Sequence, residues 1–482
     1  MDPSTKARYE VVVGLEVHAQ LMTASKIYAP DATHFGETPN THVSVISLAH
    51  PGTLPRLNKK VVEMAIKMGL ACGSEISRKQ IFDRKNYFYP DLPKGYQLTQ
   101  DRTPICIGGS LKVDDGKGAK RSIPLNRVHI EEDAGKSVHT EGQSDTLVDL
   151  NRAGVALIEI VTEPALRSSV EAGSFLTEVR RLVRYLEICD GNMEEGSLRC
   201  DANVSVRLKG TEKLGKKVEV KNLNSIKNVQ KAIDFEVERQ INLLEKQGLI
   251  ISETRLFSAD TGKTYGMREK EEMNDYRYFP DPDLSPLHIS EEWLDDIKAT
   301  LPELPWQLLE RLMKQYKLSA YDAGVLMEDR NLVHLFEQVC QHTDQYKAVS
   351  NWIMGPVKAQ FNESGTVAIS YKQLAGMINM ISAGKLSFTT ASQRLFPALS
   401  KNANAKPEIL ARELNLIQDN NDSLIADLVD AVIKDFPEKV EEYRSSKKAK
   451  GLISMFMGEL MKRSKGKADP KKANELLLNR LG

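Results

Sequence analysis

Acidic and basic side chains alternate with apolar ones near the start of the chain. In residues 14–21, Glu16, His18 and Gln20 are polar, and the residues between them are apolar or glycine. A strand sends alternate side chains to opposite faces, so this pattern predicts a strand whose carboxylate and imidazole project together from one side of a sheet. The apolar side would pack on a core. A polar face of this kind is more typical of a functional site than of an ordinary solvent-exposed surface.

The same alternation recurs in two distant segments of the chain. In residues 201–208 the polar positions include Asp201 and Asn203, and in residues 217–221 they include Glu219 and Lys221. Strands with matching patterns predict one sheet that buries its apolar face and carries these polar groups on the other. Three remote acidic elements would then meet on one surface.

A further acidic cluster lies in residues 129–136, where His129 precedes Glu131, Glu132 and Asp133. Closely gathered carboxylates repel one another unless a cation or a basic side chain neutralises them. Carboxylate oxygens with one imidazole suit Mg²⁺ or Mn²⁺. One such cluster alone is typical of a solvated loop, but three converging elements favour a metal site. Strand alternation places Glu131 beside His129, whereas a bulge would present Glu132, so both remain candidates.

Two segments combine aromatic residues with arginine, and each ends with the dipeptide Pro-Asp. They are DRKNYFYPD at residues 83–91 and DYRYFPD at residues 275–281. Rings beside cations can stack a base while the charge holds a phosphate, so Arg277 and Tyr278 are candidate substrate contacts. An aromatic plug beneath a loop is the alternative interpretation.

Asn222 and Asn224 follow the predicted strand that carries Glu219 and offer amides for orienting a polar substrate. No Ser-His-Asp or Cys-His arrangement is discernible, so nothing indicates a nucleophile that would free ammonia from an amide. The segments AGKS at 134–137 and TGKT at 261–264 lack the leading glycine of a P-loop. A nucleotide would therefore bind outside the standard loop frameworks.

Composition places the chain among globular proteins of several domains. It has 482 residues, of which 41% are hydrophobic, and its 66 basic residues balance 66 acidic ones. The five cysteines are scattered without a CxxC pair, which indicates a reducing compartment. No signal segment or membrane-spanning run is present, so a cytoplasmic protein is expected. Residues 439–482 contain 12 Lys and Arg against 5 Asp and Glu.

The pattern along the chain predicts an α+β fold in three parts. Residues 1–292 are strand-rich, with helices expected at 58–70, 169–186 and 229–247. A proline-dense segment marks the exit from this domain, and the periodicity that follows predicts two helical domains. These are a helical domain at residues 293–404 and a small basic helical tail domain at residues 405–482.

Taken in order, these motifs resemble the B subunit of the bacterial glutamyl/aspartyl-tRNA amidotransferases. The matching stretches include VVGLEVHAQL, FDRKNYFYPDLPKGYQLTQ, HIEEDAGK, MEEGSLRCDANVSVR, EVKNLNS and DYRYFPDPDL, between about residues 11 and 290. The tail stretch AKGLISMFMGELMKRSKGKADP extends the resemblance to nearly the whole chain. Ala156 departs from the proline usual at this position, which lies outside the acidic residues.

The resemblance implies a cradle-shaped catalytic domain that acts in a kinase-like first step. ATP would phosphorylate the side-chain carboxylate of glutamate mischarged on tRNA(Gln), or of aspartate on tRNA(Asn). Ammonia would then displace phosphate and form the amide. The resemblance also implies a heterotrimer, in which a partner amidase, the A subunit, supplies the ammonia and a small third protein, the C subunit, holds the pair together.

The resemblance assigns roles residue by residue. Lys85 and Lys221 become candidates for contact with phosphate or acyl phosphate, and the basic tail is expected to grip the tRNA backbone. Two alternatives remain: a non-catalytic tRNA-binding scaffold and a metal-dependent nuclease. The implied Mg²⁺ ligands are Glu16, His18, Glu132, Asp201 and Glu219.

Overall fold

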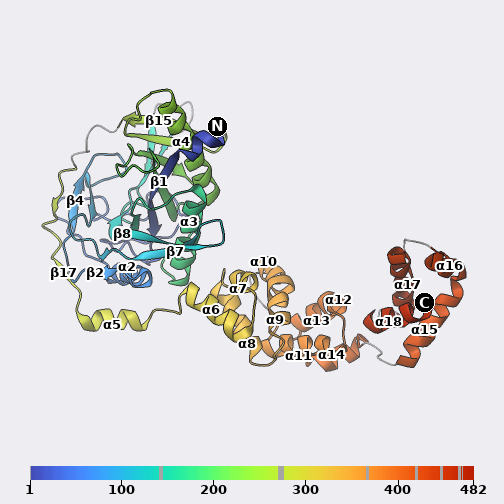
Figure 1. Cartoon of the computed structure of the whole chain (residues 1–482). Coiled ribbons are helices and arrows are strands. Elements are labelled where there is room, and N and C mark those ends of the chain that lie inside the picture. Colours follow the sequence, from blue (N-terminus) through green and yellow to red (C-terminus); the bar gives the residue numbers. More distant parts are fainter. Residues whose placement is uncertain are drawn as a thin grey trace. The chain divides into compact units, whose positions relative to one another are not determined.

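The computed structural model describes residues 2–139, 145–269, 276–364, 368–417, 422–445, 449–464, 468 and 470–482. The chain divides into two compact units, Met1–Pro305 and Trp306–Gly482 (Figure 1). Every strand of the described residues belongs to the first unit, and the second unit is helical. The predicted α+β class is therefore confirmed.

A ten-stranded sheet forms the centre of the first unit, in the order β15-β14-β13-β12-β1-β11-β8-β6-β2, with β7 paired to β8. The central strand β1 (Tyr9–Gln20) lies between β11 (Ala156–Thr162) and β12 (Leu198–Leu208), and pairs with both in antiparallel fashion. The other strands are β2 (Glu75–Ile76), β6 (Cys106–Ile107), β7 (Ser110–Asp114), β8 (Lys120–Glu132), β13 (Val218–Leu223), β14 (Glu253–Ser258) and β15 (Lys263–Glu269).

The alternation along β1 separates a core face from a polar face, as predicted. Val13, Leu15 and Val17 are at most 1% exposed and belong to the hydrophobic core of the first unit. Burying each of these side chains stabilises the fold by about 1.5–3 kcal/mol. Glu16 and His18 therefore point to the opposite side of the sheet.

Three helices of the first unit contribute their apolar stripes to the same core. They are α2 (Lys59–Cys72), α3 (Ser169–Tyr185) and α4 (Ile226–Glu245), close to the predicted ranges. The side chains of Asn58, Ser168 and Ser225 cap their first turns and satisfy backbone N–H groups that would otherwise lack partners. A short helix, α1 (Pro3–Ala7), precedes β1.

Smaller sheets complete the first unit, and one of them contacts β8 of the large sheet. In that sheet β4 (Asp83–Asn86) lies between β5 (Tyr96–Thr99) and β16 (Phe279–Pro280), so the two aromatic segments predicted from sequence meet side by side. The two remaining pairs are β9 (Lys136–His139) with β10 (Thr146–Asp149), and β3 (Lys79–Gln80) with β17 (Leu287–His288).

Two helices that lie close to the predicted domain boundaries pack on the preceding part of the chain. Helix α5 (Glu291–Ala299) buries Leu294 and Ile297 in the core of the first unit, which continues to Pro305 rather than ending at residue 292. Helix α14 (Pro407–Glu413) packs on α11 (Tyr371–Ser382). A cut at residue 404 would therefore separate two helices that share a buried contact.

The last four helices have a hydrophobic cluster of their own. They are α15 (Asp422–Asp435), α16 (Pro437–Ser445), α17 (Ala449–Arg463) and α18 (Pro470–Leu481), and their core includes Phe456 and Leu477. The earlier helices of the second unit are α6 (Pro305–Tyr316), α7 (Ala320–Leu326), α8 (Arg330–Cys340), α9 (Tyr346–Trp352), α10 (Lys358–Ser364), α12 (Phe388–Thr390) and α13 (Phe396–Ser400), with π-helical turns at Ile353–Val357 and Ala391–Leu395.

Among the described helices, none combines the length and the apolar character that crossing a bilayer requires.

Candidate metal centre on the polar face of the sheet

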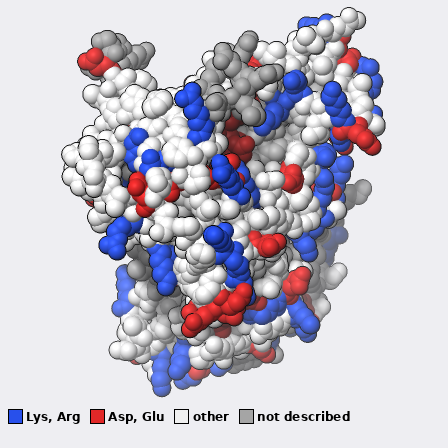
Figure 2. All heavy atoms as spheres, turned by 90° about the vertical axis from the view of Figure 1, so that its left-hand side faces the viewer, with Lys and Arg blue, Asp and Glu red and all other residues white. Residues whose placement is uncertain are grey.

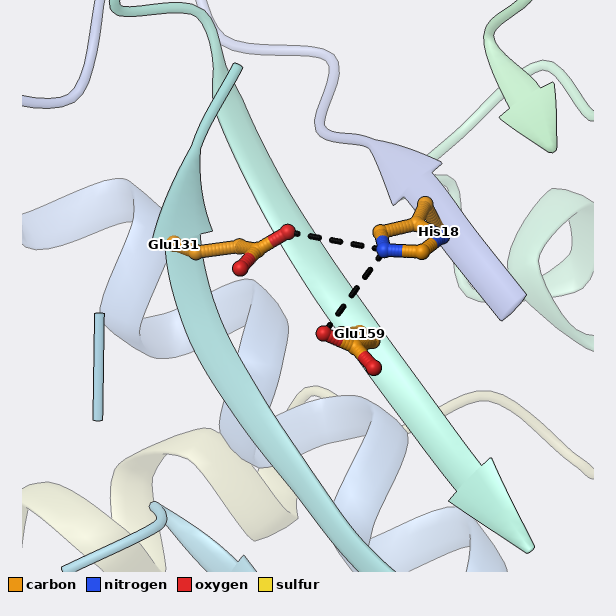
Figure 3. A group of neighbouring side chains, drawn as sticks. All are labelled: His18, Glu131 and Glu159. Atoms are coloured by element: carbon orange, nitrogen blue, oxygen red, sulfur yellow. Dashed lines mark ion pairs between the residues drawn. The ribbon is translucent and has the colours of Figure 1, made fainter. Parts of the chain in front are cut away.

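Three neighbouring strands carry a row of ionisable side chains on the polar face. Glu159 of β11 lies directly opposite His129 of β8 on one side and His18 of β1 on the other. The His18 Nε2 atom is 3.6 Å from Glu159 Oε2 and 3.6 Å from Glu131 Oε1. Figure 3 shows His18, Glu131 and Glu159 converging from their separate strands. The predicted convergence of remote acids on one face therefore occurs here.

His129 supplies positive charge to this group from within the protein. Its Nε2 atom lies 3.2 Å from Glu159 Oε2 and 3.8 Å from Glu131 Oε2. Burial alone would lower the pKa of His129, but the two carboxylates outweigh it and raise the pKa to about 9. Burial opposes ionisation of Glu159, yet the adjacent His129 and His18 bring its pKa well below the usual range. The group therefore holds an imidazolium between two carboxylates at neutral pH.

A second acidic group lies next to the first along β1. Glu16 is opposite Asp201 of β12, and one carboxylate oxygen from each of Glu16, Asp201 and Glu219 lies within 4.8 Å of the others. Lys221 Nζ is 2.6 Å from Asp201 Oδ2 and 3.2 Å from Glu219 Oε1. The Asn203 amide donates a 2.9 Å hydrogen bond to Glu16 Oε1. These residues come from the three strands predicted to share a polar face.

Negative charge exceeds positive charge across the two groups. Burial raises the pKa of Glu16, and the carboxylates of Glu159 and Glu219 raise it further. Burial would lower the pKa of Lys85, but Glu131 and other neighbours outweigh it and raise the pKa. The five carboxylates are accompanied by the cations Lys85, Lys221 and His129, while the nearby Arg199 is paired with Asp133 at 2.8 Å. A surplus of carboxylate oxygens with an imidazole fits Mg²⁺ or Mn²⁺, so the donor set suits the expected metal.

Glu132, a predicted ligand, does not join either group. Its Oε1 atom accepts hydrogen bonds from Lys94 Nζ and from the backbone N–H of Leu98, the latter at 2.9 Å. The reason is the regular pairing of β8 with β11, which is unbroken from Glu132 to Arg127 and shifts only at Val161/Thr162. Strand alternation therefore sends Glu131 to the polar face that carries both acidic groups and Glu132 to the other side.

Glu159 was not among the residues predicted from sequence, although it contacts both histidines of the first group. It is a single carboxylate within the apolar run of β11, where its neighbours Ile158 and Ile160 are fully buried. A lone charge inside a buried strand requires a partner, and this signal was available in the sequence. His129 was recognised in its acidic cluster but was given no role.

The aromatic segments hold Lys85 close to the acidic face. The Lys85 ammonium lies 4.9 Å from the ring centroid of Tyr276, which stacks edgewise on Tyr278 at 5.8 Å. Arg277 is exposed, has a φ of 46°, and accepts a hydrogen bond on its backbone oxygen from the Asn86 amide. Asp275, which opens the second segment, lies outside the described residues.

The two predicted amide contacts serve the local structure. Asn222 adopts a φ of 65°, and its side-chain amide donates a 3.0 Å hydrogen bond to Phe257 O in β14. Asn224 accepts a 2.6 Å hydrogen bond from Asn228 in the first turn of α4. Both residues therefore shape the turn that follows the Glu219 strand.

Beneath Glu132 lies a buried ammonium, that of Lys26. This side chain is 1% exposed, and its Nζ donates hydrogen bonds to His42 O at 2.7 Å and Leu150 O at 3.3 Å. Burial lowers the pKa of Lys26 to about 8, against the opposing influence of Asp31 and Glu132. The group thus connects the segment before α2 to the segment before β11.

This pKa shift predicts a change of stability with pH. The pKa of Lys26 is about 8 in the folded protein and near the ordinary 10.5 in the unfolded chain, which therefore holds more protons between these values. The cost of burying the charge, about 3 kcal/mol, is present below pH 8 and disappears as the pH rises. The thermal midpoint of the protein relative to Lys26→Met should rise between about pH 7.5 and pH 10. A constant difference across that range would contradict this prediction.

The GatB/GatE catalytic domain family matches residues 11–295, and the GatB domain family matches residues 334–481. The chain is 48% identical over 480 residues to the aspartyl/glutamyl-tRNA(Asn/Gln) amidotransferase B subunit of Nitratidesulfovibrio vulgaris strain DP4, a match that covers 99% of this chain and 100% of that protein. This chain belongs to that family of B subunits.

Other members of the family have a similar sequence identity to this chain over nearly their full length. The B subunit of Chlorobium phaeobacteroides strain BS1 is 48% identical over 477 residues, 98% of this chain and 99% of that protein. The B subunit of Pseudomonas syringae pv. syringae strain B728a is 45% identical over 480 residues, with the same shares. The family expected from the motifs is confirmed, and both acidic groups lie inside the matched catalytic domain.

Proposed function

We propose that this chain is the ATP-dependent subunit of a tRNA amidotransferase. It phosphorylates the side-chain carboxylate of glutamate on tRNA(Gln), or of aspartate on tRNA(Asn), and then admits ammonia from a partner amidase. The observation that carries this proposal is the pair of acidic groups along β1, with their surplus of negative charge and their neighbouring lysines. Phosphoryl transfer depends mainly on positioning and on cationic stabilisation of charge, which the two lysines would supply together with divalent cations held by the carboxylates.

The proposed reaction has two steps, phosphorylation of the carboxylate and its amidation by ammonia. An oxygen of the substrate carboxylate attacks the γ-phosphorus of ATP, the bond to the β-phosphate oxygen breaks, and ADP leaves. Ammonia then attacks the carbonyl carbon of the acyl phosphate, loses a proton, and expels phosphate to leave the amide. The first step turns a poor electrophile into a reactive one, and this activation is the reason for spending ATP.

Each acidic group would hold one divalent cation. The ligands would be His18, Glu131 and Glu159 in the first group, and Glu16, Asp201 and Glu219 in the second. When bound, the metal neutralises charge that develops on the phosphate oxygens. Lys85 and Lys221 lie at these groups and would contact the phosphate or the acyl phosphate. His129 would hold Glu131 and Glu159 in place through its two contacts.

The cysteines support an external source of ammonia. Burial raises the pKa of Cys72 and Cys189 to about 12, and it raises the pKa of Cys340 to about 12 as well. Thiols with such pKa values supply almost no thiolate at neutral pH and are poor nucleophiles. These three thiols are therefore poorly suited to attack an amide, and we propose that a separate amidase protein releases the ammonia within a complex that also contains a small third member.

Product analysis tests the proposal directly. The chain, combined with its amidase partner, is incubated with Mg²⁺, ATP and Glu-tRNA(Gln) or Asp-tRNA(Asn), and the ADP formed is measured. ADP formation should require the mischarged tRNA, and hydroxylamine should trap the acyl phosphate when ammonia is withheld. A non-catalytic scaffold would form no ADP. A nuclease would shorten the tRNA with Mg²⁺ in the absence of ATP.

We assign tRNA backbone contact to the basic tail, here taken as residues 439–482, which cover most of α16 and all of α17 and α18. The face in Figure 2 shows Lys and Arg side chains interspersed with Asp and Glu rather than gathered into one field. In contrast, residues 439–482 contain 12 Lys and Arg against 5 Asp and Glu. A local excess of positive charge favours binding to phosphates.

Truncation after residue 417 should raise the KM for tRNA by about tenfold or more, because several phosphate contacts are lost together. The structure places this cut after α14, so the contact between α14 and α11 stays intact. KM is measured at low and high salt, and the wild type should show the steeper salt dependence. An unchanged KM with a correctly folded remainder would overturn the tail assignment.

A further inference from the structure

A hydroxyl from the neighbouring strand holds one of the ligands of the second acidic group. Thr254 of β14 lies opposite Glu219 of β13, and its Oγ1 atom donates a 2.9 Å hydrogen bond to Glu219 Oε2. Thr254 is 1% exposed and Glu219 is 8% exposed, so water does not compete readily for this bond. The other oxygen of Glu219 faces Lys221 at 3.2 Å. One carboxylate oxygen is thus anchored while the second is presented to the acidic group.

The pairing that brings Thr254 to Glu219 follows from the local topology. β13 and β14 are parallel, whereas the other pairs among the described strands are antiparallel. A parallel pair requires a crossover, and α4 supplies it across the core face of the sheet. The Ser252 hydroxyl also donates to Lys217 O at 3.3 Å, near the start of both strands.

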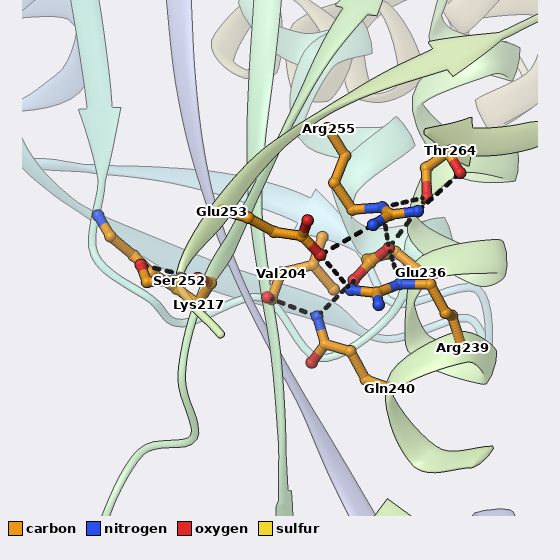
Figure 4. A network of polar contacts seen from close by, with 9 residues as sticks. All are labelled: Val204, Lys217, Glu236, Arg239, Gln240, Ser252, Glu253, Arg255 and Thr264. Carbon is orange, nitrogen blue, oxygen red and sulfur yellow. Dashed lines mark hydrogen bonds and ion pairs between the residues drawn. The ribbon is translucent and has the colours of Figure 1, made fainter. Parts of the chain in front are cut away.

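The residues on either side of Thr254 belong to a buried ionic network on the opposite face (Figure 4). Arg255 donates a 2.8 Å hydrogen bond to Glu253 and lies 3.7 Å from Glu236 of α4, which is fully buried. Arg239 joins Glu236 at 2.7 Å and Glu253 at 3.2 Å. Buried ion pairs add little net stability but can specify one register. Here they fix β14 against α4, and alternation along the strand turns Thr254 toward Glu219.

We infer that Thr254 is a positioning residue for the second acidic group: its hydroxyl orients the Glu219 carboxylate for a divalent cation. The inference rests on the proposed function, because it takes Glu219 as a metal ligand. Groups that hydrogen-bond to metal ligands fix ligand orientation, and their loss typically weakens metal binding about 10–100-fold.

The test uses the full-length chain and Mn²⁺ alone, with binding followed by electron paramagnetic resonance. Thr254→Val removes the hydroxyl with almost no change of shape and should weaken Mn²⁺ binding at one site by about 10–100-fold. Thr254→Ser keeps the hydroxyl and should bind like the wild type. In ATP cleavage, Thr254→Val should need more Mg²⁺ for half-maximal rate, with the rate at saturating Mg²⁺ largely restored.

Thr264→Val is the matched control. Thr264 Oγ1 contacts Arg255 at 2.9 Å and Glu236 at 3.2 Å, so the same substitution disturbs the ionic network without removing a bond to Glu219. Its Mn²⁺ affinity should stay within about threefold of the wild type, because no ligand-orienting bond is lost. If Thr254→Val fails to fold, Thr254→Ala is compared with Thr254→Ser instead. Both variants lack the γ-methyl group and only Thr254→Ser keeps the hydroxyl, so a difference in Mn²⁺ affinity between them reports the hydroxyl alone.

The outcomes separate this inference from the proposed function. If the wild type binds no Mn²⁺ on the sheet, the proposed metal centre itself fails. If the wild type binds Mn²⁺ and Thr254→Val, or Thr254→Ala in its place, binds it equally well, the positioning role of Thr254 is overturned and the metal centre stands. An equal loss in Thr254→Val and Thr264→Val would also overturn it, since general loosening of β14 would then explain both.

Discussion

Glu16→Gln is expected to lower kcat/KM for tRNA-dependent ATP cleavage by about 1,000-fold, equivalent to about 4 kcal/mol of transition-state stabilisation. Glu16 belongs to the second acidic group and also feels the charge of Glu159 in the first. Under the proposed function, removing its charge should therefore weaken the binding of the divalent cation. Glutamine preserves the volume of the side chain and can still accept the hydrogen bond from Asn203. Assembly with the partner proteins should survive.

The same substitution is expected to increase stability in the absence of divalent metal. Because burial and neighbouring carboxylates raise the pKa of Glu16, its ionised form costs free energy in the folded protein. This cost begins to grow as the pH rises through the ordinary carboxyl pKa, because the unfolded chain ionises there before the folded protein does. The thermal midpoint of Glu16→Gln, measured in EDTA at pH 7, should therefore lie above that of the wild type. Lost activity with gained stability is typical of a strained functional site.

Glu10→Gln is the matched control, because it makes the same change on the same strand. Glu10 pairs with Arg207 at 2.6 Å, away from both acidic groups. This variant should keep its activity within about threefold and lose a little stability, as expected for a partly exposed ion pair. If Glu16→Gln cleaves ATP as the wild type does, the catalytic role of the acidic face is rejected.

Glu131→Gln is expected to reduce metal binding and activity, whereas Glu132→Gln is expected to reduce stability, although the two residues are adjacent. Glu131 contacts His18 and His129, so its substitution should reduce Mn²⁺ affinity and ATP cleavage by about 100-fold or more. Glu132 is buried against Lys94 and the Leu98 N–H. Its substitution leaves the partly buried Lys94 ammonium without a charged partner and should lower the free energy of unfolding by about 1–3 kcal/mol.

Two measurements on the same samples distinguish these outcomes. Mn²⁺ titration reports the metal centre, and thermal unfolding in EDTA reports the fold. Glu131→Gln should change the first and largely spare the second, whereas Glu132→Gln should do the reverse. If Glu132→Gln loses Mn²⁺ binding while retaining its thermal midpoint, the orientation of β8 proposed for this site is wrong.

The sequence alone predicted the local secondary structure of the first unit. The two-residue alternation in residues 14–21 and 201–208 identified strands with one polar face, and helical spacing identified α2, α3 and α4 to within a few residues. Both patterns reflect the burial of one face, which acts on near neighbours in the chain. The sequence also predicted the protein family, because the family's motifs are long and occur in order. The comparisons with known proteins confirm this family.

Domain limits were harder to place, because they depend on contacts between remote segments. The proline-dense segment suggested an exit at residue 292, but α5 returns to the first core through Leu294 and Ile297. Likewise α14 packs on α11. A composition change marks where a helix begins, whereas the surface on which it packs is decided by the fold.

The amino-acid order thus established which side chains share a strand face, since that follows from backbone geometry alone. Which of them meet was decided by register. Pairing of β1 with β11 brought Glu159 to His18, and uninterrupted pairing of β8 selected Glu131 over Glu132. A shift of one residue would have turned each of these carboxylates to the opposite face. Register depends on turns, bulges and packing far from the strand itself, so it emerges only in the assembled sheet.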